Sequence, residues 1–413
     1  MEQSRLDAAQ LQKRDPVAWS TLLRTEPDLA DVAVTAVSAQ PLHAADSDRL
    51  DTRVARYFLT LDGCSDPICL IGKRTNAAEL LFYRAIAAQA PKLAPRCWYT
   101  HLDGDEGWIV LDDVPDDYRP PTWAANDVEA IVDDLAGLHA SFWQQAKRLQ
   151  NDGFAHFVGT KKHTLDELQE THDVFFKTGP GAILSEHAVE SAGALAPLLL
   201  KAANGLAVMQ SLSGWPGIMG ESHLTAVAEL LDDPLPMLQP LSELPMTLLH
   251  GNPFNYHWRL TFMDNRRLID WQKAKIGPGV CDLVSFVDQF DMIYQGDGRW
   301  PIQLRPAWPL SEETIIDSYL LSLSAQLGSH FSDNFDARAM RQAIPAARCL
   351  HVLTNWFPYF ANWFANMPNK FTWQKVNRMS DEQLMGTSFQ PMVGFRPYLT
   401  GVFQRFLQAY RML

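Results

Sequence analysis

The residues best suited to chemistry lie in one stretch of the chain, from residue 244 to residue 283. An apolar, strand-like run enters a polar loop at His250-Gly251-Asn252, and a second apolar run, Leu268-Ile269, ends at Asp270. A carboxylate that leaves a buried strand beside a polar loop suits Mg²⁺, which binds through one or two protein carboxylates and the phosphates of its substrate. The pattern predicts a phosphate-handling site with Asp270 as a metal ligand.

The elements before this stretch predict a small α+β lobe. Strand-like runs cover residues 32–37, 54–61, 68–73, 96–100 and 108–111. Asn76 is placed to cap a helix that continues through Tyr83, because its side chain can accept from an unpaired N–H of the first turn. Pro115 and the pair Pro120-Pro121 then interrupt the chain. This order predicts an N-terminal lobe over residues 1–114, with a β-sheet and one main helix.

The rest of the chain has a mostly helical pattern. The clearest helical periods cover residues 128–143, 314–327 and 339–364, and only the stretch with Asp270 interrupts them with strands. For residues 145–245 the sequence predicts helices that flank the site, and it assigns them no role. The sequence therefore predicts a larger, mostly helical C-terminal lobe over residues 115–413, in a bilobal α+β fold.

Composition narrows the classes of partner. The 413 residues carry a formal net charge of −13, which disfavours a nucleic acid as the main ligand because phosphate backbones need a basic face. A local basic cleft for a nucleotide remains compatible with that charge. The five cysteines are odd in number and have no zinc-ligand spacing, which predicts reduced thiols and a cytoplasmic protein. The N-terminus does not read as a signal peptide, no apolar run has the length of a membrane span, and the oligomeric state is open.

The residues around Asp270 resemble the aminoglycoside phosphotransferase and choline kinase superfamily. Ile269-Asp270-Trp271, followed by Gly277 and by Asp282-Leu283, matches the metal-binding strand and Gly-rich turn of that superfamily. The helix at 135–143 resembles its ecdysteroid-kinase-like branch. Further resemblances at residues 73–84 and 111–114 follow the same order along the chain. The resemblance spans about residues 50 to 290 and implies a protein-kinase-like fold.

The resemblance also implies roles for residues of the N-terminal lobe. Lys73 would contact the phosphates of ATP, and Glu79 would hold that lysine in place. Asp112 and Val114 would belong to the hinge that meets the adenine. Asp270 would bind Mg²⁺, so ATP and Mg²⁺ are the expected cofactors, and a small-molecule acceptor is the expected second partner.

Two positions depart from the superfamily's pattern in the catalytic loop. Its catalytic aspartate falls at Asn252, and an amide cannot take a proton as a carboxylate does. Its metal-binding asparagine falls at His257, which becomes a candidate base or metal ligand. A neutral imidazole favours Zn²⁺ or Mn²⁺ over Mg²⁺, so Mn²⁺ is an alternative metal. Asn255 is a further candidate for the missing amide oxygen.

Several nearby residues have structural interpretations beside the functional ones. We expect Asp282 to hold the loop through hydrogen bonds, and His250 to anchor the loop backbone rather than transfer protons. His139 is expected in the helical core. An aromatic cluster at residues 356–364 reads as helix core, although aromatic walls at the acceptor site would favour an apolar or planar acceptor.

These observations predict an ATP-dependent phosphotransferase that acts on a hydroxyl of a small, fairly apolar metabolite. Two alternatives remain: a pseudokinase that binds nucleotide or metabolite without transfer, and a kinase fold used for another reaction. Residues 40–51 contain no glycine, which disfavours a protein kinase, since protein kinases cover the phosphates with a Gly-rich loop.

Overall fold

The computed structural model describes residues 6–42, 53–90, 92–104, 106–158, 163–168, 184–262, 265–294, 302–304, 309–328, 335–364, 370–385, 387, 389 and 391–413. The chain divides into two units. Unit 1 consists of Met1–Arg119 and Tyr256–Ala274, and unit 2 of Pro120–Asn255 and Lys275–Leu413. The predicted lobes, residues 1–114 and 115–413, and their functions remain a prediction. The two units have other bounds, mainly because residues 256–274 belong to unit 1.

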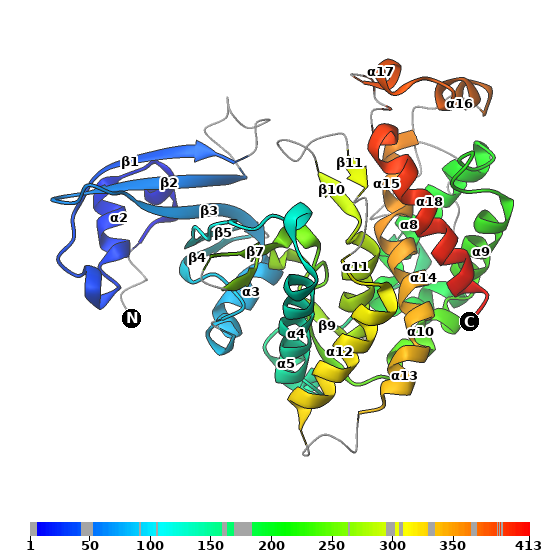
Figure 1. The fold of residues 1–413 in the computed structure, drawn as a ribbon, viewed down its shortest axis with the longest axis horizontal. Helices are drawn as coiled ribbons and strands as arrows, with labels where there is room; N and C mark the ends of the chain where they lie inside the picture. Colours follow the sequence, from blue (N-terminus) through cyan, green and yellow to red (C-terminus); the bar gives the residue numbers. More distant parts are fainter. Residues whose placement is uncertain are drawn as a thin grey trace. The chain divides into compact units, whose positions relative to one another are not determined.

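Unit 1 is built on a five-stranded antiparallel sheet (Figure 1). Its strand order is β1-β2-β3-β5-β4, so the fifth strand lies inside the sheet and the fourth forms an edge. The strands are β1 (Val34–Pro41), β2 (Val54–Leu61), β3 (Ile68–Asn76), β4 (Cys97–Asp103) and β5 (Glu106–Asp112). All five match strand-like runs of the sequence. Residues 43–52, which include most of the glycine-free stretch, lie outside the described residues.

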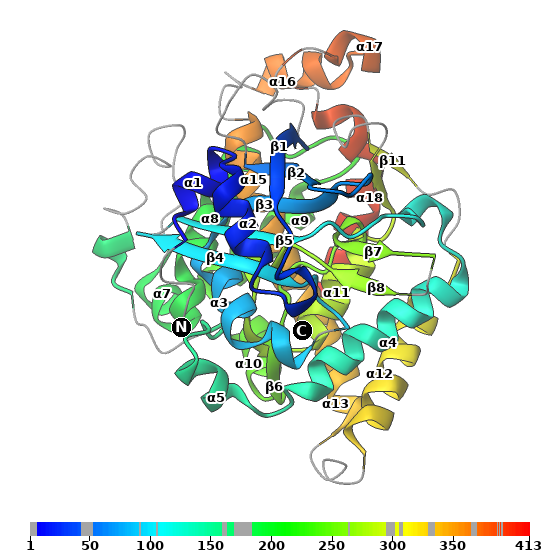
Figure 2. The same ribbon diagram turned by 90° about the vertical axis from the view of Figure 1, so that its left-hand side faces the viewer.

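Two short helices, α1 (Ala8–Gln12) and α2 (Pro16–Leu23), cover one face of this sheet (Figure 2). Trp19 of α2 packs on Tyr57 of β2, with ring centroids 4.9 Å apart. Gly72 of β3 faces the same side, where an added Cβ would lie 2.5 Å from the Tyr57 ring. Since side chains alternate along a strand, the neighbours of Gly72 point to the opposite face.

Helix α3 (Ala77–Ala85) lies on that opposite face. Asn76 caps it as expected, since its side chain accepts from the Glu79 N–H. Two short strands, β7 (Trp258–Leu260) and β8 (Arg266–Leu268), also belong to unit 1. The Trp271 ring after β8 stacks on Phe82 of α3 at 3.6 Å between centroids. This stacking brings Asp270 to the helix that carries Glu79.

Unit 2 is mostly helical. Its helices are α4 (Ala125–Ser141), α5 (Ala146–Asn151), α7 (Glu186–Ala192), α8 (Ala196–Ser211), α9 (Glu221–Asp232), α10 (Leu235–Ser242), α11 (Val280–Gln289), α12 (Glu312–Leu327), α13 (Ala337–Gln342), α14 (Ile344–Asn355), α15 (Phe357–Phe364), α16 (Lys370–Asn377), α17 (Asp381–Leu384) and α18 (Pro391–Tyr410). Its strand pairs are β6 (Met246–Leu249) with β9 (Lys275–Pro278), and β10 (Met292–Tyr294) with β11 (Ile302–Leu304). Across the described residues of both units, short 3₁₀ turns span Pro27–Leu29, Ala87–Gln89, Pro120–Thr122, Gly193–Leu195, Asn255–His257 and Trp271–Lys273.

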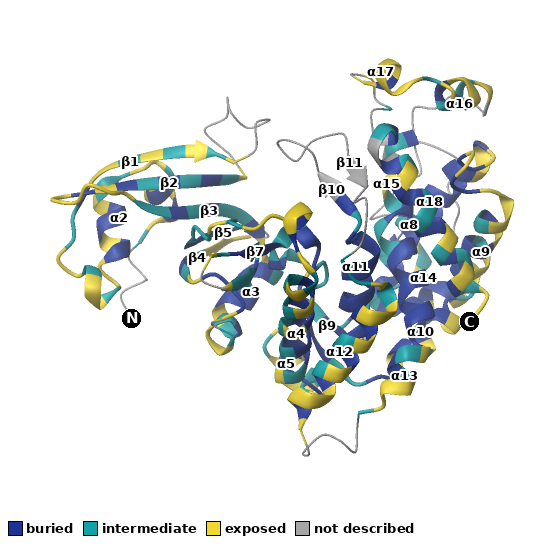
Figure 3. Cartoon of the chain, viewed as in Figure 1, coloured by how far each residue is buried: buried dark blue, intermediate teal, exposed yellow. Residues whose placement is uncertain are grey.

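Helices α11 and α14 pack against each other and are buried along most of their length (Figure 3). The aromatic cluster at 356–364 is largely core, because Trp356, Phe357, Phe360 and Phe364 are all at most 5% exposed. One helical stretch of the described residues, Glu186–Ser211, has the length and composition of a membrane span. Its apolar window is 72% buried within the chain, as in a core helix.

The expected α+β fold is confirmed, with a sheet and one main helix in unit 1 and helices dominating unit 2. Two details of the sequence interpretation are wrong. The segment with a helical pattern at residues 339–364 does not form one helix but the three helices α13, α14 and α15. Pro345 stands in the first turn of α14, where its missing N–H costs nothing, so a new helix begins there. Asp282 and Leu283 lie on helix α11 rather than in a strand-and-loop segment.

Candidate functional site

The first group of candidate residues lies in unit 1 and begins with Lys73. The strand alternation that points Gly72 toward α2 points Lys73 and Thr75 toward α3. Glu79, in the first turn of α3, is fully buried and accepts from both residues. The Lys73 Nζ lies 3.0 and 2.8 Å from the two Glu79 carboxylate oxygens. The predicted pairing of Lys73 with Glu79 is therefore present.

The same ammonium also contacts the Asp270 carboxylate. The chain after Asp270 is fixed to the same helix, because the Trp271 N–H donates to Glu79 Oε1 at 3.1 Å. The Lys73 side chain is 12% exposed and the Asp270 side chain 33% exposed. The three groups form a half-buried cluster of two carboxylates and one ammonium.

Asp270 has a backbone conformation that few residues with a side chain adopt. Its φ is +69° and its ψ is +61°, in the left-handed region, which costs an ordinary L-residue about 1–2 kcal/mol and costs Asp or Asn less. His257 Nε2 lies 3.4 Å from its second oxygen, Oδ2. Non-glycine residues in this region concentrate at functional sites. The geometry thus singles out Asp270 as the centre of this cluster.

The donor set fits a divalent cation only in part. Within the described ranges, no group of three His, Cys, Asp or Glu side chains could hold a metal ion by itself. Asp270 supplies one carboxylate and His257 one imidazole. Such a set fits a cation that takes its remaining ligands from phosphate oxygens and water, as Mg²⁺ commonly does.

The expected hinge residues lie at the end of β5, where Asp112 is the last residue of the strand and Val114 comes two positions later. The Asp112 N–H donates to Arg96 O at 2.9 Å, and its carboxylate accepts from Trp98 Nε1 at 2.6 Å. Val114 is half-buried. Asp113 between them forms a two-point ion pair with Arg56 of β2, at 2.5 and 3.1 Å. The segment is fixed to the sheet, and its contact with an adenine stays a prediction.

The second group of candidate residues lies in unit 2, on the loop after β6. Asp282 is 1% exposed and accepts from the backbone N–H groups of His250 and Gly251, at 2.7 and 2.9 Å. Gly251 has a φ of +82°, which a residue with a side chain adopts only with strain. These bonds are the contacts that the loop-anchoring hypothesis for Asp282 requires.

His139 supports Asp282 from helix α4. Its Nε2 lies 3.4 Å from the Asp282 carboxylate and its Nδ1 2.7 Å from the Tyr319 hydroxyl. Burial raises the Tyr319 pKa well above its usual value, so this hydroxyl remains protonated. Gly279 lies so close to Tyr319 that an added Cβ would be 2.3 Å from the Tyr319 hydroxyl oxygen. His139 is fully buried, as expected for a core histidine.

Asn252 follows in the same loop. Its N–H donates to His250 Nδ1 at 3.3 Å, and its side-chain oxygen accepts from Gln289 Nε2 at 3.1 Å. Gln289 Nε2 also reaches Ser285 Oγ at 2.9 Å, one turn earlier on α11. The side chain of residue 252 is thus oriented by a donor, which suits a carboxylate oxygen as well as an amide oxygen.

Asn255 is 1% exposed, and its Nδ2 donates to Phe290 O and Met292 O, both at 3.1 Å. Its Oδ1 is buried and accepts no hydrogen bond from the described residues. An unpaired buried acceptor is costly. It keeps open the alternative that Asn255 supplies the amide oxygen absent at residue 257.

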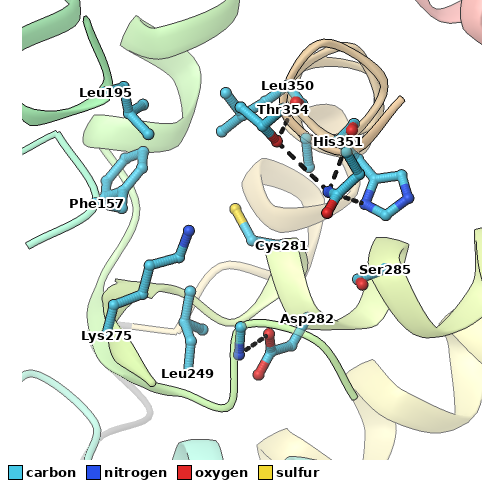
Figure 4. A pocket seen from close by; sticks show the side chains of 13 residues that line it. Phe157, Leu195, Leu249, Lys275, Cys281, Asp282, Ser285, Leu350, His351 and Thr354 are labelled. Atoms are coloured by element: carbon cyan, nitrogen blue, oxygen red, sulfur yellow. Dashed lines mark hydrogen bonds between the residues drawn. The ribbon is translucent and has the colours of Figure 1, made fainter. Parts of the chain in front are cut away.

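A pocket in unit 2 adjoins this loop (Figure 4). Gly251 and Asp282 border it, together with the β9 residue Lys275 and residues of helices α11 and α14. The aromatic cluster at 356–364 does not line it. Phe157 and Leu195 supply its apolar side instead.

Three residues of these groups were not singled out by the sequence. Thr75 stands two positions after Lys73, and strand alternation alone could have placed it on the same face. Gln289 stands seven positions after Asp282, which is two turns along one helix face. No local pattern identifies Lys275, because a large part of its pocket comes from helix α14, which is distant in the sequence.

Residues 49–308 match the sequence profile of the phosphotransferase enzyme family (APH), which is well over half of the chain. No curated protein sequence matches the chain at a significant level.

Three solved structures illustrate what the chain is similar to. A choline kinase from Cryptosporidium parvum Iowa II is 10% identical, with 96% of each chain covered and a TM-score of 0.47. An aminoglycoside phosphotransferase from Alicyclobacillus acidocaldarius is 13% identical, with 87% of this chain and 90% of that chain covered and a TM-score of 0.40. A choline kinase from Streptococcus pneumoniae is 10% identical, with 96% and 99% covered and a TM-score of 0.42.

Proposed function

The chain belongs to the phosphotransferase enzyme family, and from that membership we propose that it transfers the γ-phosphate of ATP to a hydroxyl of a small metabolite. The observation that carries the proposal is the contact of one ammonium, that of Lys73, with both Glu79 and Asp270. An ammonium held by a buried carboxylate beside a partly exposed carboxylate provides a group for the phosphate oxygens and a group for a metal ion, as in kinases.

In this proposal the residues of unit 1 bind the nucleotide. Lys73 donates to its phosphate oxygens, and Glu79 prevents the lysine from swinging away because it is itself fixed by Thr75 and Trp271. Asp270 and His257 would hold the metal ion, Mg²⁺ or Mn²⁺, which when bound neutralises charge on the phosphates. The segment with Asp112 and Val114 would meet the adenine.

The residues of unit 2 position the acceptor. Asp282 fixes the backbone of His250 and Gly251, and this backbone carries Asn252. The Asn252 amide would orient the acceptor hydroxyl by hydrogen bonding. It cannot take the proton, and loss of a general base costs about 10²–10⁴ in rate. Since phosphoryl transfer depends mainly on positioning and charge stabilisation, the reaction remains feasible at reduced speed.

A second candidate function is nucleotide binding without transfer. The observation that favours it is Asn252 itself, an amide at the position where the family carries its base. Gln289 donates to that amide oxygen, so the side chain at this position is held although it cannot accept the proton. A kinase fold used for another reaction is the remaining alternative.

Nucleotide binding and transfer are tested separately on the wild-type chain. Differential scanning fluorimetry with ATP and Mg²⁺ or Mn²⁺ reports binding, because a ligand at 100 times its dissociation constant adds about 2.7 kcal/mol of stability. Incubation with ATP and a panel of alcohols, analysed by mass spectrometry, reports transfer. Glu243→Gln is the control variant, since Glu243 is exposed at the end of α10, where it accepts from Gln239, and lies outside both groups of candidate residues.

The proposal expects stabilisation by ATP and a phosphorylated product. Stabilisation with no product from any alcohol supports the second candidate instead. An unchanged melting temperature together with no product contradicts both.

A further inference from the structure

The pocket beside the Asn252 loop contains a lysine, Lys275, for which the described part of the chain provides no carboxylate partner. The Lys275 side chain, at the start of β9, points its ammonium into the cavity (Figure 4). Lys275 is half-buried, and no carboxylate within the described ranges lies at ion-pair distance from it. A partly desolvated charge without a partner is costly, and an anionic ligand would offset that cost.

The carboxylate of Asp282, which also lines the pocket, does not neutralise the charge of Lys275. Asp282 is the acidic residue among the described lining residues, and its oxygens already accept from the His250 and Gly251 N–H groups. The other polar side chains that line it, those of Cys281, Ser285, His351, Thr354 and Asn355, contribute no carboxylate. A cationic ligand would therefore meet the Lys275 ammonium without a carboxylate left to pair with it.

The other lining residues indicate which chemical groups the ligand would carry besides its anion. Phe157 and Leu195 line one side and suit an apolar body of small size. On another side, Ser285 is bonded to Gln289, and Gln289 is bonded to Asn252. The pocket is therefore linked through two hydrogen bonds to the side chain that the proposed function assigns to the acceptor hydroxyl.

We propose that this pocket binds the acceptor and that the acceptor is an anionic alcohol, whose carboxylate or phosphate oxygens pair with Lys275. The inference rests on the proposed function for the identity of the ligand as an acceptor. The pairing with Lys275 is a property of the pocket and can be measured without turnover. Lys275 is in this account a specificity residue and takes no part in the transfer itself.

The binding experiment compares matched ligands on the full chain. The probes are small hydroxy acids with an apolar body, such as 3-phenyllactate and 3-hydroxybutyrate, against the amides of the same acids. Alcohols that carry a phosphate monoester form a separate arm, so that the two sources of negative charge are distinguished. Calorimetry gives the dissociation constant of each pair.

We expect the wild type to bind the acids or the phosphate esters at least about tenfold more tightly than uncharged partners of equal size. Lys275→Met removes the charge, keeps most of the stem and should abolish that preference. Lys275→Arg should restore part of it. Lys147→Met, an exposed lysine of the same unit on α5, should leave the preference unchanged.

Turnover then separates this inference from the proposed function. If an acid binds through Lys275 and no phosphate is transferred, the anion site stands and the proposed function fails. If an uncharged or cationic alcohol is phosphorylated equally well by the wild type and by Lys275→Met, the inference fails and the proposed function stands. Equal binding of acids and amides, or no binding of either anion class, also overturns the inference.

Discussion

The Lys73 ammonium contacts the Asp270 carboxylate although 197 positions separate the two residues. Glu79 contacts the same ammonium at 2.8 Å. Two carboxylates share one positive charge, so the cluster has a net negative charge and favours a further cation. The cluster is thereby suited to a metal ion that arrives with the phosphates of a nucleotide.

Replacing Lys73 with Met should destabilise the fold. Glu79 is fully buried and would lose its charged partner, and breaking a buried ion pair from one side costs about 3–5 kcal/mol. The cost here should be near the lower limit, since Thr75 and the Trp271 N–H still donate to Glu79. Urea unfolding followed by circular dichroism measures the difference.

The control for this change is Arg56→Met. Arg56 also pairs with a carboxylate, that of Asp113, but its side chain is 35% exposed. Exposed pairs contribute about 0–1 kcal/mol. Equal losses for Lys73→Met and Arg56→Met would contradict the special position of the Lys73 cluster.

The left-handed backbone at Asp270 predicts an order of stability among its variants. Asp270→Ala and Asp270→Gly both remove the carboxylate, but only Ala retains a Cβ that opposes a φ of +69°. The Gly variant should therefore be more stable than the Ala variant by about 1 kcal/mol. Thermal unfolding of the two proteins measures this difference, and a more stable Ala variant would show that the strain is absent.

A candidate site could be proposed from the sequence because its motifs are local. Residues 244–283 lie in one stretch, and the spacing of Asp270 from Asp282 is set by neighbouring elements. The pairing of Lys73 with Glu79 could also be foreseen, because one strand end and one helix turn separate them. The strands of unit 1 were predicted by alternation and by turn residues in the same way.

Contacts made by distant elements could not be foreseen. The segment with Asp270 reaches Lys73 where Trp271 stacks on Phe82 and donates to Glu79, and nothing near these residues predicts those contacts. Lys275 lines a pocket because α14 faces it, about 70 residues further along the chain. The three helices at 339–364 share one apolar period, so the breaks at Ala343 and Trp356 were not visible in the pattern.

Asn252→Asp should accelerate phosphotransfer. Gln289 donates to the side-chain oxygen of residue 252 and can donate equally to a carboxylate, so the new side chain should keep its orientation. Restoring a general base should raise kcat by about 10²–10⁴ at neutral pH. Steady-state kinetics with the best acceptor measure it. A fall in kcat for this variant would mean that the amide has a catalytic role of its own.

Asp282→Asn should disrupt the loop that carries Asn252. The amide nitrogen would face one of the two N–H groups that now donate to the carboxylate. Leaving a buried donor unpaired costs about 1–3 kcal/mol, with a larger cost when a charged acceptor is lost. Urea unfolding gives the stability, and transfer should fall together with it. Full stability and full activity in this variant would contradict the anchoring role of Asp282.

Three thiols with raised pKa values predict a loss of stability in alkaline solution. Burial raises the pKa values of Cys97, Cys281 and Cys349 from 9.0 to about 12. Between pH 9 and pH 12 the unfolded chain loses these protons while the folded chain retains them. Each thiol therefore lowers the free energy of unfolding by about 1.4 kcal/mol per pH unit in that window, and has no effect below pH 9.

Cys349→Ala tests this linkage. Its free energy of unfolding should fall less steeply than that of the wild type between pH 9 and pH 10.5, while any cavity cost stays constant with pH. Cys64→Ala is the control, since Cys64 is exposed. Parallel curves for the wild type and Cys349→Ala would contradict the predicted shift of the Cys349 pKa.

The central claim is that the cluster around Asp270 supports transfer of the γ-phosphate of ATP to an alcohol. The most direct test incubates the wild type and Asp270→Asn with γ-labelled ATP, Mg²⁺ and the alcohol panel, and counts label in the alcohol fraction. Asn keeps the size and the left-handed preference of Asp, so the two proteins should fold alike. The account predicts labelled alcohol from the wild type and a loss of about 10²-fold or more in the variant. Equal labelling by both proteins would contradict it.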